Sequence, residues 1–412
     1  MSEVNTITAL NGLYKKVYDG KLENLIPDGT KLLNAIKFVR KEKRPGADYN
    51  QSVILGMEHG VSFAEPDEGA FLLNPPIAGT IKQASIRGYQ MVLRSAMAFD
   101  TMFAADSAGE RAFEEATKYI FQAMMDSISK KLEIRLFYGQ SGLANVESTS
   151  GNVITVASSE WAPGIWGGSE NMRVELYDSV DTLLGDCKVT AVDFDLKKIT
   201  VDSLPSLSAA VGVVSIFEFG SKGKEMAGLH KIITNTASIF NISASAYSLW
   251  KGNSHSCQVA SADAPLSFNK LAKGLAKPVA KGLQSDVTVY VNPSSWADLM
   301  TEQAGSRRFD VSYKAGGTAQ SGSEALEFFS QNGKMTIVSS IFVKQGYAYA
   351  INHDQFLRVG STDLTFKNPL SKEDFFHLLE NNAGIGIRCY TNQALFCTKI
   401  GHQLVFTGIS AS

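Results

Sequence analysis

The segment that most restricts how this chain can fold is one that has no means of burying itself. Residues 51–99 contain two runs of alternating apolar and polar residues, SVILGM and TIKQASIRGYQMVLRS, which predict strands. Between the runs lies EPDEGAFLLNPP, whose proline, glycine and acidic residues predict a loop. The segment is therefore expected to form one long hairpin. Because a two-stranded element is marginally stable alone in water, this hairpin must lie against something else.

A long helix is the clearest element of the sequence. Between residues 107 and 139, apolar residues recur every three or four positions and form one stripe. Ser107 and Glu110 have capping-box spacing at its start, and Gly139 is placed to adopt the left-handed conformation that ends a helix. About thirty residues rising 1.5 Å each give a length of about 45 Å, so the helix is expected to act as a strut.

The rest of the chain predicts a mixed α+β protein. Short alternating runs separated by turns, from about 145 to 222, predict an inserted β-rich domain that forms a small sandwich or barrel. Farther on, residues 267–283 predict a helix interrupted at Pro278, and residues 371–382 predict another helix. This irregular order differs from the βαβ alternation of a doubly wound sheet.

Composition argues against several classes of function. The 412 residues include 39 Lys and Arg against 41 Asp and Glu, so the chain lacks the basic excess of proteins whose task is to grip nucleic acid. Its one basic run is KFVRKEKRPG, residues 37–46. No apolar stretch has the length of a signal-peptide core or a membrane span, and we expect a soluble protein without membrane contact. Four scattered cysteines without a CxxC motif predict neither a disulfide framework nor a zinc site.

Two motifs for catalysis begin and are not completed. A phosphate-binding loop would need a lysine where GTAQSGSE, residues 317–324, has Ser323. A nucleophile elbow would need a glycine where GQSGL, residues 139–143, has Leu143. Neither motif predicts a catalytic site.

Two pairs of residues remain as candidates for chemistry. Glu373 and His377 lie four apart on a predicted helix, but two ligands do not make a metal site. His353 and Asp354 are adjacent between two strand-like runs, where they could belong to a Ser-His-Asp arrangement or mark a turn. Because Asn352 precedes them, and Asn and Asp favour turns by bonding to nearby backbone, we favour the turn. No catalytic, metal-binding or cofactor-binding residue is therefore expected.

The order of these elements resembles that of the major capsid proteins of tailed bacteriophages that share the HK97-like fold. The resemblance extends over nearly the whole chain and includes MAGLHKIITNTASIFNIS, VYVNPSSWADL and IRCYTNQALF, without a single diagnostic motif. It implies an α+β fold with an N-terminal arm, an extended hairpin called the E-loop, a spine helix in a peripheral domain, and an axial domain. The implied boundaries are 1–50 for the arm, 51–99 for the E-loop, 100–144 for the peripheral domain with its spine helix, 145–222 for the inserted β domain, 223–335 mainly for the axial domain, and 336–412 for returning peripheral strands, a helix and C-terminal axial strands.

The resemblance also implies a function. Members of this family self-assemble into hexamers and pentamers of an icosahedral shell that encloses double-stranded DNA. The partners it implies are further copies of this chain, a portal protein, a separate scaffolding protein, decoration proteins, and packaged DNA held by weak nonspecific contact. The implied location is the virion capsid, assembled in the host bacterial cytoplasm, and no enzymatic activity is expected.

Charged residues on the arm, the hairpin, the helix and the returning strands are the candidates for contacts between subunits. Lys82 is the one lysine of the hairpin. Some relatives form an isopeptide crosslink from such a lysine, but we favour an ordinary solvated side chain here, because a shared fold does not imply shared site chemistry. The candidate contact residues are Arg40, Lys41, Lys43, Arg44, Glu65, Asp67, Glu68, Lys82, Arg87, Glu114, Lys130, Arg135, Arg358, Asp363 and Glu373.

Three alternatives stay open at the level of sequence. The same fold builds encapsulin-like compartments, which enclose an enzyme instead of a genome. A hydrolase that uses His353, Asp354 and an unidentified serine would leave the hairpin and the arm unexplained. An accessory protein that binds carbohydrate or a host surface through the inserted β domain would use Trp161 and Trp166, which could equally be core residues of that domain.

Overall fold

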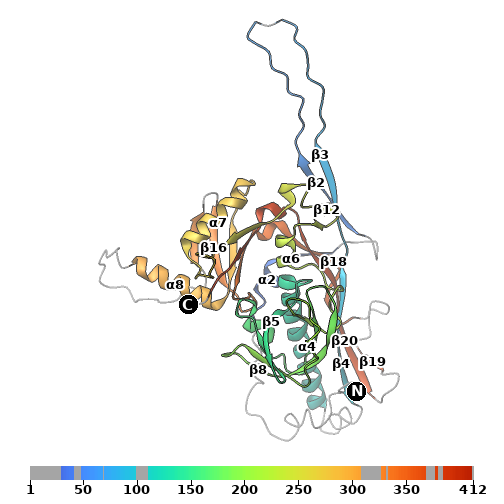
Figure 1. Cartoon of the computed structure of the whole chain (residues 1–412). Helices are drawn as coiled ribbons and strands as arrows, with labels where there is room; N and C mark the ends of the chain where they lie inside the picture. Colours follow the sequence, from blue (N-terminus) through green and yellow to red (C-terminus); the bar gives the residue numbers. More distant parts are fainter. Residues whose placement is uncertain are drawn as a thin grey trace, which may run out of the picture.

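A 29-residue helix, α4 (Glu110–Tyr138), packs against a long antiparallel sheet and forms the frame of the molecule (Figure 1). The computed structural model describes residues 29–40, 48–67, 69–98, 110–307, 326–330, 333–367, 376–378 and 384–410. The predicted apolar stripe of the helix is confirmed where its side chains are described, because every residue of it is buried. These residues are Ile120, Met124, Ile128, Leu132 and Leu136.

The end of α4 differs from the prediction. Gly139 does not adopt the left-handed conformation; Gln140 (φ 64°) and Gly142 (φ 78°) do. A Cβ on Gly139 would lie 2.1 Å from the carbonyl oxygen of Met226, so glycine is required there by the close approach of two backbone segments. Ser107, the predicted cap at the other end, lies outside the described residues.

The long sheet is arranged around its longest strand, β20 (Gly384–Cys397). On one side β20 pairs with β4 (Tyr89–Ala98), and on the other side with β18 (Phe356–Thr365) and β19 (Phe376–Leu378). β1 (Phe38–Arg40) adds to the edge of β18 in parallel. Segments from the start and the end of the chain therefore share one sheet.

Two sequence predictions about this sheet are wrong. The E-loop boundary of 51–99 includes β4, but all ten residues of β4 pair with β20 and not with the other strand of the hairpin. The helix predicted over 371–382 contains strand β19, in which His377 pairs with Gly386. His377 is therefore not part of a helical metal-binding pair, and Glu373 lies outside the described residues.

Residues 29–40, predicted to belong to a free arm, pack against the body. In α2 (Lys31–Ala35), the backbone N–H groups of Leu32 and Leu33 donate to the buried carboxylate of Glu133 at 2.8 and 2.6 Å. Arg358 Nε donates to the carbonyl of Ile36 at 2.9 Å. Residues 29–40 therefore lie on the body of the same chain, and residues 1–28 and 41–47 of the predicted arm lie outside the described residues.

A second sheet has six strands and carries helices α7 (Phe268–Ala280) and α8 (Pro293–Arg307). Helix α7 continues through Pro278, where the sequence predicted an interruption, and ends two residues later. Strands β16 and β17 lie in this sheet, so the chain returns to the long sheet after residue 351 and not at 336 as expected. In order across the sheet, the strands are β13 (Asn253–Ser256), β21 (Leu404–Thr407), β17 (Tyr347–Ile351), β14 (Val287–Val291), β16 (Gly333–Ser339) and β15 (Leu326–Ser330).

Six strands close into a barrel within the segment predicted to be a small sandwich or barrel. The core of this region includes Trp161 and Trp166, whose rings stack with centroids 6.2 Å apart. Both side chains are buried, so the exposed aromatic surface needed by a carbohydrate-binding accessory protein is absent at these two positions. The strands of the barrel are β5 (Ala144–Ser150), β6 (Val153–Val156), β7 (Arg173–Tyr177), β8 (Leu183–Asp193), β9 (Lys198–Val201) and β10 (Ser215–Glu218).

The four cysteines are buried and form no disulfide. Burial raises the pKa of the thiols of Cys187, Cys257 and Cys389 to about 11 and that of Cys397 to about 12.

Short elements connect the sheets, the barrel and the helices. They are η1 (Ser158–Glu160), α5 (Pro163–Trp166), α6 (Leu229–Thr234), β11 (Ser238–Ile239), β12 (Ile242–Ser243), η2 (Ser248–Trp250), η3 (His353–Gln355) and η4 (Ile400–His402).

The barrel, the six-stranded sheet and α4 meet at a buried polar junction. Lys344 Nζ lies 2.5 Å from Glu160 Oε2, and the Tyr347 hydroxyl donates to Glu160 Oε1 at 2.9 Å. The backbone N–H of Lys344 donates to the hydroxyl of Tyr138, at the end of α4, at 2.7 Å. Burial acts to raise the pKa of Glu160, but the charge and hydrogen bond of Lys344 outweigh it and hold that pKa below its usual value. Removing either partner would leave a buried charge unpaired, so the pair fixes the barrel to the body.

His230 completes this junction as a neutral side chain. Its Nδ1 lies 2.9 Å from the Tyr349 hydroxyl oxygen, and its ring packs edge-on against that of Tyr347 at 5.0 Å. Burial lowers the pKa of His230 to about 4, and the charge of Lys344 adds to this effect while that of Glu160 opposes it. The folded protein therefore resists protonation of His230 in mild acid.

We expect the stability of the folded chain to fall between pH 6.5 and about 4, in part because of His230. The unfolded chain takes up a proton on this imidazole near pH 6.5 and the folded chain only near pH 4, so acid in this window favours unfolding. The difference between these two pKa values corresponds to a loss of roughly 3 kcal/mol in the free energy of unfolding. Chemical denaturation across it should show that His230→Gln has a shallower loss of unfolding free energy than the wild type. An equal slope in His230→Gln would contradict the assignment.

Candidate protein–protein interface

A hairpin of β2 (Tyr49–Gly56) and β3 (Thr80–Ile86) projects far beyond the rest of the molecule (Figure 1). The two strands are antiparallel, and a further bridge between His59 and Ile77 extends their pairing toward the tip. This is the hairpin that the alternating runs predicted. Its second strand is shorter than expected, because the second predicted run is divided into β3, which stays in the hairpin, and β4, which pairs in the long sheet.

The tip of the hairpin has a defined local structure. The backbone N–H of Asn74 donates to Ser62 Oγ at 2.7 Å, and its side chain donates to the carbonyl of Val61 at 2.8 Å. Large apolar side chains nevertheless face water: Leu72 is 95% exposed and Phe63 is 87% exposed. Exposed apolar surface of this extent marks an interaction site. The exposed large apolar side chains of the hairpin are Ile54, Met57, Val61, Phe63, Phe71, Leu72, Leu73, Ile77 and Ile81.

The root of the hairpin, in contrast, is anchored in the core. The ring of Tyr49 lies 5.3 Å from that of Phe396 in β20, and Ala84 is fully buried. The backbone N–H of Ser85 donates to the carbonyl of Phe240 at 3.0 Å. The direction of the projection is therefore set by the body of the chain, while the surface of its outer part is left for another molecule.

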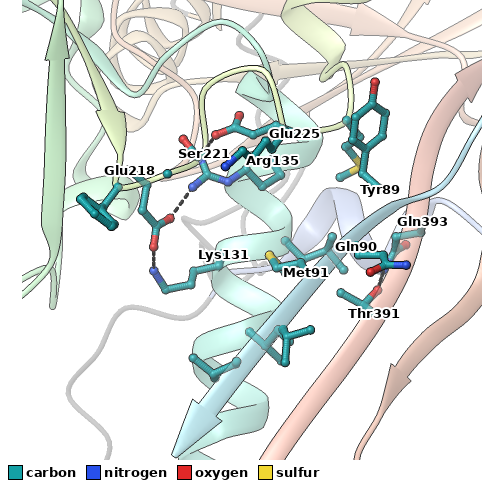
Figure 2. Close-up of a pocket in the computed structure, with 18 residues that line it drawn as sticks. Tyr89, Gln90, Met91, Lys131, Arg135, Glu218, Ser221, Glu225, Thr391 and Gln393 are labelled. Atoms are coloured by element: carbon teal, nitrogen blue, oxygen red, sulfur yellow. Dashed lines mark hydrogen bonds and ion pairs between the residues drawn. The ribbon is translucent and has the colours of Figure 1, made fainter. Parts of the chain in front are cut away.

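A groove with a volume of about 380 Å³ lies where α4, β4, β20 and the chain leaving the barrel meet (Figure 2). Its walls come from four segments far apart in the sequence. They are residues 89–93, 128–135, 218–226 and 391–393.

Four charged side chains on one wall of the groove pair with one another. Lys131 and Arg135, on successive turns of α4, both donate to Glu218 at the end of β10, and Arg135 also lies 3.1 Å from Glu225 (Figure 2). Burial acts to raise the pKa of Glu218, but the charges of Lys131 and then Arg135 outweigh it and hold that pKa below its usual value. These groups are engaged with one another, so they offer no free acid, base or nucleophile.

The other wall and the rim of the groove present apolar and aromatic surface. Tyr89, Val92 and Phe219 are each partly exposed. Ser221 Oγ is buried at the groove and has no hydrogen-bond partner among the described residues. Since a buried hydroxyl without a partner is costly, an incoming polar group would be stabilised there. The groove therefore suits an apolar peptide segment that carries a few polar groups.

The predicted contact residues of the hairpin lie on its surface. Glu65, Asp67 and Lys82 are exposed, and Asp67 takes the left-handed conformation at the tip (φ 70°). Arg87 is bound to Asp48 at the root. Glu65 and Asp67 therefore both lie on the exposed surface near the tip.

Other predicted contact residues are engaged within the chain. Arg135 is buried in the groove wall, and Arg358 is buried with Asp363 at 2.9 Å and the carbonyl of Ile36. Lys130 Nζ donates to the carbonyl of Gly167. Arg40 is exposed on β1. Lys41, Lys43, Arg44, Glu68 and Glu373, together with the side chain of Glu114, lie outside what the structure describes.

His353 and Asp354 form a turn, as the sequence favoured. They open the short helix η3, where the Asn352 side chain accepts a hydrogen bond from the backbone N–H of Asp354 at 2.9 Å. Within the described residues, the ring of His353 bonds to the Tyr290 hydroxyl at 2.8 Å and to Thr288 Oγ1 at 3.4 Å. Burial lowers the pKa of His353. The imidazole is held in place by neighbouring strand residues, and no hydrogen bond joins it to a described serine.

Two further observations apply to the described part of the chain. No group of three or more His, Cys, Asp or Glu residues there is arranged to hold a metal ion. No helix there is both long and apolar enough to cross a bilayer.

The sequence did not indicate the groove. Lys131 was visible only as one of several basic residues in the last turns of a helix, and Glu218 only as the end of a strand. Their pairing joins positions 87 residues apart, and an ion pair between distant positions leaves no local pattern. The one sequence signal was the position of Arg135, directly before Leu136 of the apolar stripe. An arginine that becomes buried at such a position needs an acidic partner.

No protein-family model matches this sequence, and no curated protein matches it. Among solved structures, a chain of the cyanophage A-1(L) capsid asymmetric unit superposes with a TM-score of 0.59 at 12% identity, covering 98% of both chains. The capsid of a native GTA particle gives a TM-score of 0.49 at 8% identity, covering 99% of this chain and 100% of that one. The holo-SrpI encapsulin complex from Synechococcus elongatus gives 0.45 at 6% identity, covering 100% and 98%. The first similarity confirms the HK97-like capsid fold expected from the sequence, and the two weaker ones add nothing to that conclusion.

We expect the double variant Leu72→Ser, Leu73→Ser to change the free energy of unfolding of the dissociated chain by no more than about 0.5 kcal/mol, because both side chains are already in water. Leu132→Ser, on the buried stripe of α4, should lower it by about 3 kcal/mol or more. Urea denaturation of the dissociated protein measures both changes. A large loss in the hairpin variant would mean that the tip packs against its own chain.

Proposed function

We propose that this chain is the major capsid protein of a tailed bacteriophage, a structural protein without enzymatic activity. Its copies associate into hexamers and pentamers of an icosahedral shell around double-stranded DNA. The observation that carries the proposal is the hairpin, which projects far from the body and exposes large apolar side chains along its length. The fold shared with a capsid chain supports it.

The energetics of the hairpin favour association between copies. Burial of one leucine or phenylalanine side chain stabilises a contact by roughly 1.5–3 kcal/mol. Covering Phe63, Leu72 and Leu73 alone therefore supplies several kcal/mol to each contact. Part of this is lost to ordering and desolvation, but each subunit donates one hairpin and receives one, so the contacts accumulate around a closed ring.

The groove of a neighbouring copy is the surface that we assign to receive the tip. Its partly exposed Tyr89 and Val92 offer apolar area, and Ser221 offers an unpaired hydroxyl. The acidic residues Glu65 and Asp67 would then lie at the rim of the contact, where they set orientation more than affinity. A head-to-tail contact of this kind generates a ring when its rotation closes.

The remaining partners follow from the same proposal. A shell of this type grows around a separate scaffolding protein, is interrupted by a portal, and is covered by decoration proteins where these exist. The mature location is the virion, after assembly in the cytoplasm of a bacterial host.

The test is electron microscopy and sedimentation of the purified full-length protein, expressed with and without a candidate scaffolding protein. The wild type is expected to form closed shells, tubes or ring-shaped capsomers. Leu72→Ser, Leu73→Ser is expected to remain a folded monomer, because the apolar area that drives association has been made polar.

The matched control makes the same chemical change elsewhere. Leu183→Ser, Leu196→Ser alters two exposed leucines of the barrel region and should assemble as the wild type does. A wild-type monomer under every condition would refute the proposed function. Normal particles from the hairpin variant would refute the role given to the tip.

A further inference from the structure

Helix α7 carries a row of lysines along one face, which we call the lysine face. Lys270, Lys273 and Lys277 within the helix and Lys281 directly after it follow at intervals of three, four and four residues. Side chains at such intervals are neighbours on a helix surface. Over eleven residues the row extends about 16 Å.

The opposite face of α7 holds the row in a fixed position. Leu271 and Leu275 are buried against the six-stranded sheet. A Cβ on Gly274 would lie 2.3 Å from the ring of Phe406 in β21, so glycine allows the helix to lie directly on that strand. The lysine face is therefore a rigid outer surface of the molecule.

The charges of this face are not neutralised within the described residues. Lys270 Nζ donates to the carbonyl of Pro265 at 2.6 Å, and Lys281 Nζ donates to that of Lys251 at 2.7 Å. Lys277 likewise bonds to a carbonyl of β13. These bonds orient the ammonium groups without cancelling their charge. Other cations of the described residues, among them Lys131, Arg135, Lys344 and Arg358, do have a carboxylate partner.

A histidine beside the row responds to its positive potential. His255 lies on β13, the strand at the edge of the six-stranded sheet. Burial lowers its pKa, and the charges of Lys277, Lys270 and Lys273 lower it further. Three lysines thus act together on one point of the surface.

The basic surface continues beyond the helix. A hollow of about 420 Å³ at the root of the hairpin is lined by Lys281, Lys399 and His402, and no carboxylate lines it. Lys281 belongs to both the hollow and the row, so the two are continuous.

The chemistry of this face indicates a polyphosphate and not a protein. Between the lysines, the exposed residues of α7 are Ala272, Ala276 and Ala280, and none is a large apolar or aromatic side chain. Protein interfaces depend on such anchors, and the lysine face has none. Duplex DNA carries roughly ten phosphates over about 16 Å of its axis, so it can meet every lysine of the row at once.

We propose that the lysine face of α7 binds the phosphate backbone of duplex DNA independently of base sequence. Lysine is a flexible point charge, which suits contacts with phosphates that need no fixed geometry. The binding itself is a property of the isolated chain. That the bound duplex is the enclosed genome, with the lysine face turned inward, rests on the proposed function.

The test is fluorescence anisotropy of a short labelled DNA duplex titrated with the full-length protein between about 50 and about 200 mM salt. Lys273→Gln, Lys277→Gln is expected to weaken binding about tenfold or more at low salt. It should also reduce the slope of log affinity against log salt by about two, since two phosphate contacts are lost. Ala276→Glu, which leaves every lysine in place, should weaken binding as well.

The matched control removes the same charge elsewhere. Lys198→Gln, Lys231→Gln changes one lysine of the barrel and one of α6 and should bind DNA as the wild type does. Thermal unfolding of all variants checks that loss of binding is not loss of folding.

The outcomes separate this inference from the proposed function. Wild-type affinity in Lys273→Gln, Lys277→Gln would overturn the inference. Displacement of the duplex by polyglutamate at equal charge concentration would also overturn it, because this result would indicate an acidic protein partner. Shells that form normally from a chain that binds no DNA would overturn the inference and leave the proposed function standing. DNA binding by a chain that never assembles would do the reverse.

Discussion

The last turns of α4 join three segments that lie far apart in the sequence. Glu133 accepts the backbone N–H groups of α2, Arg135 holds the chain that leaves the barrel, and Tyr138 accepts from the loop before β17. All three side chains are buried, and each joins segments that are distant in sequence. Because a buried polar group without its partner is costly, these bonds specify one arrangement of the sheets and the barrel around the helix. The direction of the hairpin and the shape of the groove follow from that arrangement.

The elements that could be predicted from sequence are those with a strong local period. The stripe of α4 repeats every three or four residues, and the strands of the hairpin alternate, so both were identified by pattern alone. The helix predicted over 371–382 was wrong because its short central apolar run fits the period of a strand as well as that of a helix. Pairing of β19 with the distant strand β20 makes this run a strand. Gly139 was assigned to the helix end because glycine favours that position, whereas the close approach of Met226 cannot be read from sequence.

The candidate site was predictable in its hairpin and not in its groove. Exposed apolar residues in a segment that cannot fold on itself are a property of that segment. The groove combines four segments, and it forms only once the sheet, the helix and the barrel are in place.

The distribution of charge over the surface was likewise not predictable from the sequence alone. The chain as a whole is nearly neutral and has no basic excess. Several of its cations, however, are paired inside the molecule, and the lysines of α7 lie together once the helix is formed. Net charge therefore says little about local potential.

The four buried thiols have a consequence for the chemistry of the chain outside a cell. Only a thiolate attacks disulfides or reacts readily with oxidants, and burial keeps these four groups protonated and out of reach. Transfer from reducing to oxidising surroundings therefore alters no covalent bond of the subunit. A particle built from this chain would leave a lysed cell with the same covalent structure in which it was assembled, and its durability would rest on packing and charge instead of on sulfur chemistry.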